Sequence, residues 1–420
     1  MHLLTSLGRQ ATWLTSAATD PVFLKGFASA CVADDATLSR FTPADVASLE
    51  AFASHHDTVV DLACKPKTGR CYSGDHRARQ NVSVKFGDFL AYFRAAFEGS
   101  EHWLATVEDL DFYLCQCPIA VHKPDETCSD AVLPKVCELL KIPSALPIEV
   151  LTQINLWMTV HASQTSLHYD AYRNVLVVLH GKKSVTVYPP SDCGDLRANP
   201  VYSASANHSP VDVQRLKLGE TLSTQGQTFC VGAGDALYIP EGWWHHVDSD
   251  PFTIAVNFWY EGLRDTITRD SRMTTYYARV AMQALLTEQI STTVRALHVS
   301  ARSSRLATSQ VTCTDIAAEV TQASRELAML AIEGREFLAI QSSMATQLPQ
   351  VWRSMLMHAS IDFAGALAHC WESFSSEEEL LAVIFSSLGD EEDEIKQQLL
   401  VKQEAFHHKI FKRTVATTLG

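Results

Sequence analysis

Short segments in which apolar and polar residues alternate fill the middle of the chain, from about residue 110 to residue 262. Gly, Pro and Asn separate these segments, as they separate the strands of antiparallel sheets. The clearest segments are DFYLCQC, INLWMTV, NVLVVLH, SVTVYPP, DALYIP and FTIAVNFWY. The pattern predicts a mainly β protein with the fold of a jelly roll, also called a double-stranded β-helix.

The segments before and after this region space their apolar residues differently. Residues 1–109 mix apolar runs such as TVVDLAC with helical spacing in FGDFLAYFRAAF, which predicts an α/β segment packed on the barrel. Residues 266–420 are rich in Ala, Leu, Glu and Gln at helical spacing, and they predict a helical C-terminal region. The barrel itself is expected to occupy residues 110–265.

Two local signals mark the helical region. Ser376 and Glu379 have the spacing of a capping box ahead of LLAVIF. The acidic run GDEEDE at 389–394 is expected to form a solvated turn, after which EIKQQLLVKQEAFHHKIFKR continues as a helix.

One strand brings a histidine and a carboxylate together. His168 and Asp170 stand two apart in QTSLHYDAYRN, so both side chains leave the same face of a strand. His245 follows a turn at Gly242 in GDALYIPEGWWHHV and is the predicted third ligand, with His246 as the alternative. Three ligands on one face leave coordination positions open, which suits iron(II). A zinc hydrolase uses the same ligand types with a bound water, so the triad alone leaves both chemistries open.

The residues around the triad extend the pattern. HYDAYRNVLVVLHGKK, IPEGWWHHV and AVNFWY, in this order, resemble the JmjC family of cupin oxygenases. They are most similar to its small hydroxylase branch, which includes factor-inhibiting HIF and the tRNA-wybutosine hydroxylase. The resemblance runs from about Tyr113 to Gly262. It implies a dioxygenase that uses iron(II), 2-oxoglutarate and O2, releases succinate and CO2, and employs His245 rather than His246.

The resemblance also implies a binding site for 2-oxoglutarate. Lys183 in HGKKS matches the lysine that binds the far carboxylate of this co-substrate in the family, whereas Lys182 has the opposite strand parity and is expected to face outward. Thr165 and Tyr113 match hydroxyl donors to the same carboxylate.

Three further positions, Asn174, Asn257 and Trp259, match residues near the metal or substrate in the hydroxylase branch, and Tyr172 shares the strand parity of the ligands. Asn174 and Asn257 match amides that flank the metal, with sheet packing as the alternative for both. Trp259 and Tyr172 are predicted to lie near the substrate, with roles in core packing as the alternative. Glu261 stands where the asparaginyl hydroxylase of the branch carries a lysine, so the substrate of that enzyme is not carried over.

Strand parity predicts a ligand cavity without reference to any family. Alternate residues of FTIAVNFWY leave opposite faces of a strand. One face is the more polar and is expected to line the cavity: Thr253, Ala255, Asn257 and Trp259. The other is apolar and is expected to pack on the surrounding layer: Phe252, Ile254, Val256 and Phe258.

Charge and cysteine content limit the partners and the compartment. A net charge of -14 opposes general attraction to phosphate backbones, so a nucleic-acid partner is not expected. Eleven irregularly spaced cysteines favour free thiols in the cytoplasm or nucleus. The less favoured alternative is a second zinc site that would use Cys115, Cys117, Cys128 and Cys137.

The remaining compartment signals concern membranes and the N-terminus. No run reaches the ~18 apolar residues needed to cross a bilayer, so no membrane span is expected. Residues 1–19 contain Arg9 and several hydroxyl residues but no acid, which loosely resembles an organelle transit peptide. An ordinary first helix is the alternative.

These features together favour hydroxylation of a protein or peptide side chain. Demethylation of methyl-lysine in histones and hydroxylation of a tRNA base are alternatives with the same chemistry, and an inactive cupin that only binds is the non-enzymatic one. Residues 191–228 are rich in Ser, Asn and Pro and are expected to form a loop over one mouth of the barrel. By resemblance, the C-terminal helices are expected to form a homodimer, and helices that simply cap the barrel are the alternative.

Overall fold

The computed structural model describes residues 19–419 except 70, 73–79, 108, 125–127, 145, 147, 204, 213–223, 263–269, 306–337, 339–340, 343–344, 347–348 and 374–377. The segment that resembles a transit peptide, apart from residue 19, and Ser376 of the expected capping box lie outside the described residues. Contacts divide the chain into two compact units. Unit 1 is Met1–Asn199 with Ser205–Ala278, and unit 2 is Pro200–Ala204 with Arg279–Gly420.

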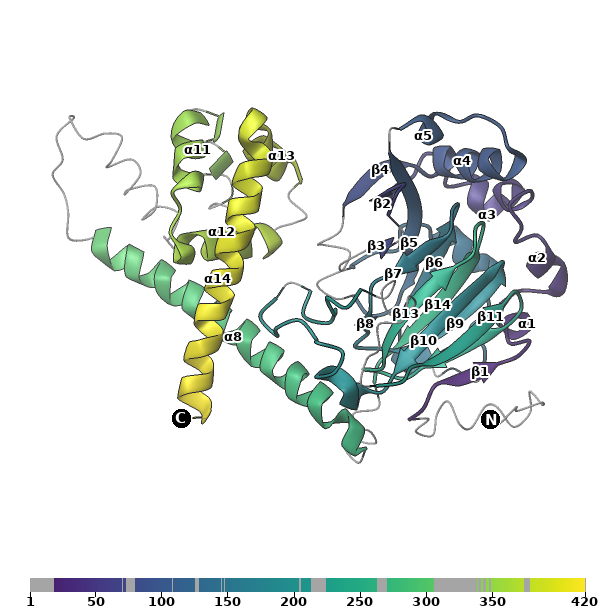
Figure 1. The fold of residues 1–420 in the computed structure, drawn as a ribbon. Coiled ribbons are helices and arrows are strands. Elements are labelled where there is room, and N and C mark those ends of the chain that lie inside the picture. Colours follow the sequence, from purple (N-terminus) through teal and green to yellow (C-terminus); the bar gives the residue numbers. More distant parts are fainter. Residues whose placement is uncertain are drawn as a thin grey trace. The chain divides into compact units, whose positions relative to one another are not determined.

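Unit 1 is built from two sheets (Figure 1). The larger has the strand order β1-β12-β9-β14-β6-β5-β2-β4, and the smaller has the order β11-β10-β13-β7-β3 with β8 paired to β13. Every pair is antiparallel except β3 with β7. The expected jelly roll is confirmed.

The bounds of the strands are as follows: β1 Val22–Leu24, β2 Val59–Pro66, β3 Cys71–Tyr72, β4 Asn81–Lys85, β5 Leu110–Val121, β6 Leu151–Thr159, β7 Ser163–Thr165, β8 His168–Tyr169, β9 Arg173–His180, β10 Lys182–Tyr188, β11 Gln227–Gly232, β12 Ala236–Ile239, β13 Trp244–Ser249 and β14 Ile254–Tyr260.

Strand β9 shows how the two layers of core are made. Val175, Val177 and Leu179 belong to the main apolar cluster, which the N-terminal helices share. Leu176 and Val178 leave the opposite face and join a second cluster together with residues of β10 and β11 from the smaller sheet. A strand that is buried on both faces is apolar at nearly every position, which explains the run NVLVVLH.

The N-terminal segment extends the larger sheet at both edges. Strand β1 pairs with β12 at one end of the strand order, and β2 pairs with β5 toward the other end, where β4 follows. The helices of this segment are α1 Ala28–Cys31, α2 Asp35–Ser39, α3 Glu50–Ala53, α4 Phe86–Glu98 and α5 Trp103–Thr106. Helix α4 buries Phe86, Phe89 and Phe93 in the main cluster, as its spacing predicts.

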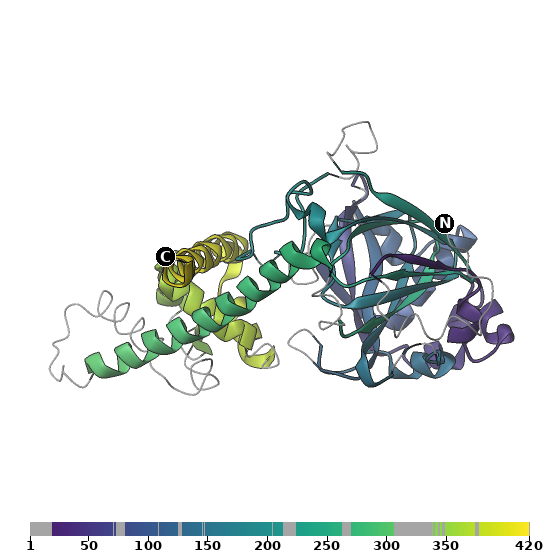
Figure 2. The ribbon, with the colours of Figure 1, turned by 90° about the horizontal axis from the view of Figure 1, so that it is seen from below.

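Unit 2 is helical. Its described helices are α8 Thr274–Arg305, which begins in unit 1, α11 Pro349–Met357, α12 Ile361–Ser373, α13 Glu378–Ser386 and α14 Glu392–Leu419. Helix α14 crosses α8 in Figure 1 and lies beside it in Figure 2, and Ile290 of α8 shares an apolar cluster with Phe406 and Ile410 of α14. Among the helices within the described ranges, none is long and apolar enough to cross a bilayer.

The acidic run of unit 2 differs slightly from the expected turn. Gly389–Glu391 form one turn of 3-10 helix, and α14 begins directly at Glu392. Three acidic residues therefore lie in the first turn of α14, where the partial positive charge of the helix N-terminus stabilises carboxylates.

Candidate metal centre and its cavity

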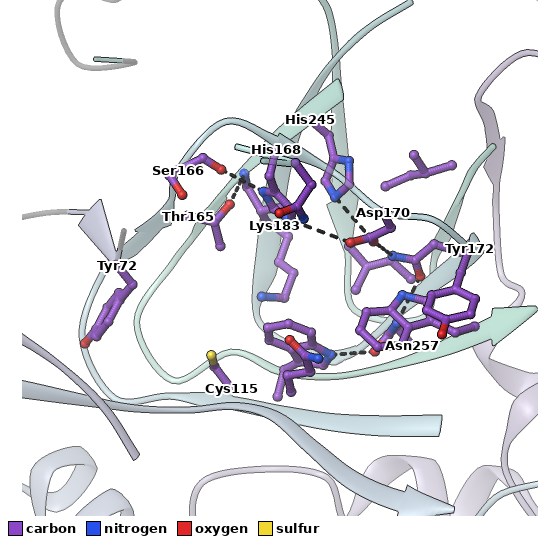
Figure 3. A pocket seen from close by; sticks show the side chains of 18 of the residues that line it. Tyr72, Cys115, Thr165, Ser166, His168, Asp170, Tyr172, Lys183, His245 and Asn257 are labelled. Carbon is purple, nitrogen blue, oxygen red and sulfur yellow. Dashed lines mark hydrogen bonds and ion pairs between the residues drawn. The ribbon is translucent and has the colours of Figure 1, made fainter. Parts of the chain in front are cut away.

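A cavity of about 250 Å³ lies inside the barrel of unit 1, between the inner faces of the two sheets. All of the residues predicted for the site contribute to its wall: Tyr113, Thr165, His168, Asp170, Tyr172, Asn174, Lys183, His245, Asn257 and Trp259. Residues as far apart in the sequence as Thr165 and Asn257 thus meet around one space (Figure 3).

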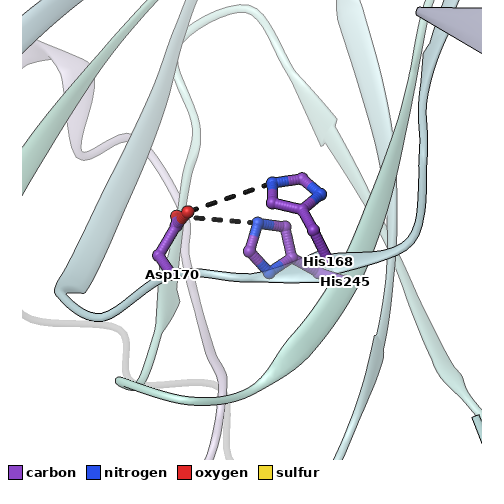
Figure 4. Close-up of side chains that lie close together, drawn as sticks. All are labelled: His168, Asp170 and His245. Atoms are coloured by element: carbon purple, nitrogen blue, oxygen red, sulfur yellow. Dashed lines mark ion pairs between the residues drawn. The ribbon is translucent and has the colours of Figure 1, made fainter. Parts of the chain in front are cut away.

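Three of these side chains converge as a candidate metal centre (Figure 4). His168 of β8 and His245 of β13 are partners in the sheet register, and Asp170 follows β8 directly. The Nε2 atom of His168 lies 3.9 Å from Oδ1 of Asp170, and Nε2 of His245 lies 3.7 Å from Oδ2. Each residue offers a ligand atom within 4.8 Å of the others. Within the part of the chain that the structure describes, this is the one group of His, Cys, Asp and Glu with such geometry.

Both histidines are held in the tautomer that a metal requires. The Nδ1 atom of His168 donates to the carbonyl oxygen of Ser166 at 2.8 Å, and Nδ1 of His245 donates to that of Trp243 at 3.0 Å. Because each Nδ1 carries the hydrogen, each Nε2 presents a lone pair toward Asp170. The site is therefore oriented for two imidazole ligands and one carboxylate.

Two amides hold the carboxylate of Asp170. Asn174 donates from Nδ2 to Oδ2 of Asp170 at 3.2 Å, and its own Oδ1 accepts from Nδ2 of Asn257 at 3.1 Å. Both amides are buried. Sheet packing, the alternative for these residues, does not account for a chain of hydrogen bonds that ends on the candidate ligand.

The cationic end of the cavity is formed by Lys183. Its side chain is 3% exposed, and Nζ donates to Oγ of Ser249 at 2.7 Å and to the Tyr113 hydroxyl at 3.3 Å. Burial lowers the pKa of this ammonium group to about 8. Thr165 lies in the same wall, and its Oγ1 accepts from the backbone N–H of Val247 at 2.9 Å. An anion in this part of the cavity would meet one cation and several hydroxyls.

An aromatic pair forms another part of the wall. Tyr172 stacks on Trp259 with ring centroids 5.3 Å apart and an angle of 21° between the planes. Trp259 and Asn257 line the cavity, whereas Ile254, Val256 and Phe258 of the same strand lie in the main core. The parity expected for this strand therefore holds for Asn257 and Trp259, whereas Ala255 packs in an apolar cluster and the Thr253 hydroxyl bonds to the backbone of Lys182 instead of lining the cavity.

Positions that were alternatives or exceptions lie outside the wall. His246 faces the other side of β13, with Nδ1 3.8 Å from Oδ2 of Asp248, and is not among the residues around the cavity. Lys182 is exposed, as its parity predicts. Glu261 pairs with Lys123 at 2.7 Å, at the surface.

Several residues of the cavity wall were not predicted from the sequence, among them His208 and Trp157. His208 stacks on His168 with centroids 5.1 Å apart, and its Nδ1 lies 2.9 Å from Oγ of Ser166. It belongs to the segment 191–228, which has no strand or helix periodicity, so the sequence did not indicate that this histidine reaches the barrel. Trp157 could have been found by strand parity, since it stands between the core residues Leu156 and Met158 in β6 and so faces the cavity.

Comparison with known proteins covers the same region. A family model described as a cupin-like domain matches residues 15–266. Lysine-specific demethylase JMJ31 of Arabidopsis thaliana is 31% identical over 274 residues, which are 61% of this chain and 49% of that protein. Bifunctional peptidase and (3S)-lysyl hydroxylase JMJD7 of Homo sapiens is 32% identical over 130 residues, 26% of this chain and 41% of that protein. The chain thus spans about half of these relatives or less.

Proposed function

The chain belongs to the family of proteins with a cupin-like domain, and on that premise we propose that it is an iron(II)- and 2-oxoglutarate-dependent dioxygenase of the JmjC type. The observation that carries the proposal is the presence of Lys183 in the same cavity as the His168, Asp170 and His245 triad. A zinc hydrolase needs no buried cation opposite its metal, whereas a dicarboxylate co-substrate does.

Two groups of cavity residues would bind the metal and the co-substrate. His168, Asp170 and His245 would hold iron(II) on one face and leave the other face open. Lys183, Tyr113 and Thr165 would bind the far carboxylate of 2-oxoglutarate, so that its keto acid end lies toward the metal. When bound, iron(II) would catalyse the oxidation of 2-oxoglutarate by dioxygen to succinate and CO2. One oxygen atom of the dioxygen enters succinate and the other enters the substrate as a hydroxyl group.

Hydroxylation of a protein side chain is the reaction we favour. One relative is named a lysyl hydroxylase and another a lysine-specific demethylase, and both names refer to lysine. The second candidate is demethylation of methyl-lysine, which is favoured by the longer match to the demethylase, 274 residues. A tRNA base fits less well with a net charge of -14. An inactive binding cupin would need neither the triad nor Lys183.

The proposal extends to location and assembly. We place the protein in the cytoplasm or nucleus, because its eleven irregularly spaced cysteines do not have the pattern of a disulfide framework. A homodimer through the C-terminal helices has support from Leu400 and Val401 of α14, which are 55% and 67% exposed. A single-chain mass by light scattering at micromolar concentration would remove the dimer.

Co-substrate binding tests the proposal without turnover. We expect 2-oxoglutarate to bind the manganese(II)-loaded protein in calorimetry, and Lys183→Gln to weaken this binding at least tenfold because the buried cation is lost. Lys182→Gln is the matched control, since Lys182 is the exposed neighbour on the same strand and should bind as the unaltered protein does. Equal affinity of the Lys183→Gln variant would contradict the proposed co-substrate site.

A further inference from the structure

A chain of three hydrogen bonds runs from an indole to the candidate metal ligand. Trp157 of β6 donates from Nε1 to Oδ1 of Asn257 at 2.7 Å. Asn257 of β14 donates from Nδ2 to Oδ1 of Asn174 at 3.1 Å. Asn174 of β9 donates from Nδ2 to Oδ2 of Asp170 at 3.2 Å. The three strands are neighbours in the larger sheet, so the chain crosses it from strand to strand.

The groups at the two ends of this series of hydrogen bonds have a fixed role as donor or acceptor, whereas the two amides between them do not. An asparagine amide has an oxygen and an NH2 group of similar size, so it can turn by 180° and exchange acceptor for donor. An indole N–H can only donate, and an ionised carboxylate can only accept. A donor at Trp157 therefore requires Oδ1 of Asn257 to face it, which turns Nδ2 of Asn257 toward Asn174 and Nδ2 of Asn174 toward Asp170.

We propose that Trp157 is a positioning residue for the metal centre, because its N–H sets the direction of both amides and so keeps a donor on Asp170. The inference rests on the proposed metal site and is independent of the oxygenase chemistry. Asn257 and Asn174 are 1% and 7% exposed, so water has little access to them and does not readily replace a lost partner.

Removal of the indole N–H would release this constraint. Oδ1 of Asn257 would lose its donor, and the amides could turn so that Asn174 presents its oxygen to the carboxylate of Asp170. Two facing acceptors repel each other, which would displace the carboxylate from its ligand position. Outer partners of metal ligands typically change metal affinity by about 10- to 100-fold, and we expect the lower end because Trp157 acts through two amides.

The test is a cobalt(II) titration of the full chain, followed by the visible absorption of the bound ion. Trp157→Phe keeps an aromatic ring and removes the N–H, and we expect about tenfold weaker binding. Asn174→Ala should also weaken binding. In the Asn174→Ala background, Trp157→Phe should cause no further loss, because the connection to Asp170 is already cut.

Two outcomes with the same three variants would overturn the inference. Trp157→Phe binding within twofold of the unaltered protein, or an equal tenfold loss in the Asn174→Ala background, would show that the indole acts by packing or not at all. Failure of the unaltered protein to bind cobalt(II) would overturn the metal centre itself and this inference with it. The two failures are thus distinguishable.

Two further variants separate the N–H from general damage to the barrel. Trp352→Phe is the matched control for affinity, since Trp352 lies in the apolar core of unit 2, its buried Nε1 has no hydrogen-bond partner among the described residues, and its loss should leave cobalt(II) affinity unchanged. If Trp157→Phe does not fold, Asn257→Leu interrupts the same chain and should give the same tenfold loss. Unchanged affinity of a folded Asn257→Leu variant would overturn the inference.

Discussion

Lys183 is a cation in an interior where its described hydrogen bonds go to two hydroxyls, those of Ser249 and Tyr113. Burial of an ammonium group without a carboxylate costs free energy, and the lowered pKa of about 8 expresses that cost. A bound anion would supply the negative charge that the buried ammonium group lacks. A perturbed residue of this kind in a cavity is typical of a functional site.

This residue predicts a pH dependence of co-substrate binding. The charged form of Lys183 binds a carboxylate, and it is fully present below its pKa of about 8 and lost above it. We therefore expect the Kd of 2-oxoglutarate for the manganese(II)-loaded protein to be flat on the acid side and to rise up to tenfold per pH unit above about 8. Calorimetry across that range measures it. A Kd that stays constant up to pH 9.5 would contradict the role of Lys183.

The ion pair of Lys65 and Asp111 predicts a stability change. Nζ lies 2.5 Å from Oδ2, and the two side chains are only 4% and 11% exposed. Asp111→Ala would leave a buried ammonium without its partner, which we expect to cost about 3 kcal/mol of unfolding free energy. Urea denaturation measures it. The exposed pair of Asp57 and Lys85 is the control, and Asp57→Ala should have no measurable effect.

At the scale of elements, the turn between β9 and β10 sets the register that carries Lys183 inward. Gly181 lies there at a φ of +79°, and a Cβ on it would come within 2.8 Å of the Cα of Thr253. We expect Gly181→Ala to lower the unfolding free energy by roughly 1–3 kcal/mol, because both the backbone angle and the close approach oppose a side chain.

A melting experiment on two variants checks this. Gly232→Ala is the matched control, since Gly232 also lies in the smaller sheet and a Cβ there would meet nothing within 4 Å. Its melting temperature should stay close to that of the unaltered protein. If Gly181→Ala melts at the same temperature as Gly232→Ala, the turn is not constrained as described.

The same scale explains what sequence could predict. Strands β5, β6, β9, β10, β12 and β14 were all expected, because their alternation or continuous apolar character reflects burial. Strand β13 was not recognised as a strand, since the two apolar residues of WHHVDS, Trp244 and Val247, lie on opposite faces and produce no alternation. Strands that build a site depart from the patterns that identify strands.

For the candidate site, prediction depended on whether a residue lay in a readable strand. The ligands and Lys183 were found from spacing and resemblance, and all of them lie in the cavity wall. His208 was missed because it reaches the cavity from a segment with no periodicity. Strand parity could have placed Trp157 at the cavity, but its role depends on the orientation of two amides, which no one-dimensional pattern records.

At the scale of the whole molecule, the site lies within unit 1, and each unit has apolar clusters of its own. Tyr202 belongs to unit 2, where it stacks on His408 of α14 with centroids 4.6 Å apart. The domain limits expected at residues 109 and 265 stay predictions, and contacts divide the chain near residue 278.

This division predicts that a chain ending at Ala278 folds and binds metal without unit 2. Tyr202→Ser should accompany the truncation, because removal of α14 would expose the Tyr202 ring. We expect a cooperative thermal transition and cobalt(II) affinity within about threefold of the full chain, since every residue of the triad remains. Loss of cooperative unfolding would show that unit 1 depends on unit 2.

The most direct test of the oxygenase assignment is the release of labelled CO2 from 1-labelled 2-oxoglutarate by the full chain with iron(II), ascorbate and dioxygen. We predict release that increases with lysine-containing peptides and falls to background in the His168→Ala variant, because one of the three ligands is gone. No release from iron-loaded protein, with or without peptide, or equal release by the His168→Ala variant, would contradict the assignment.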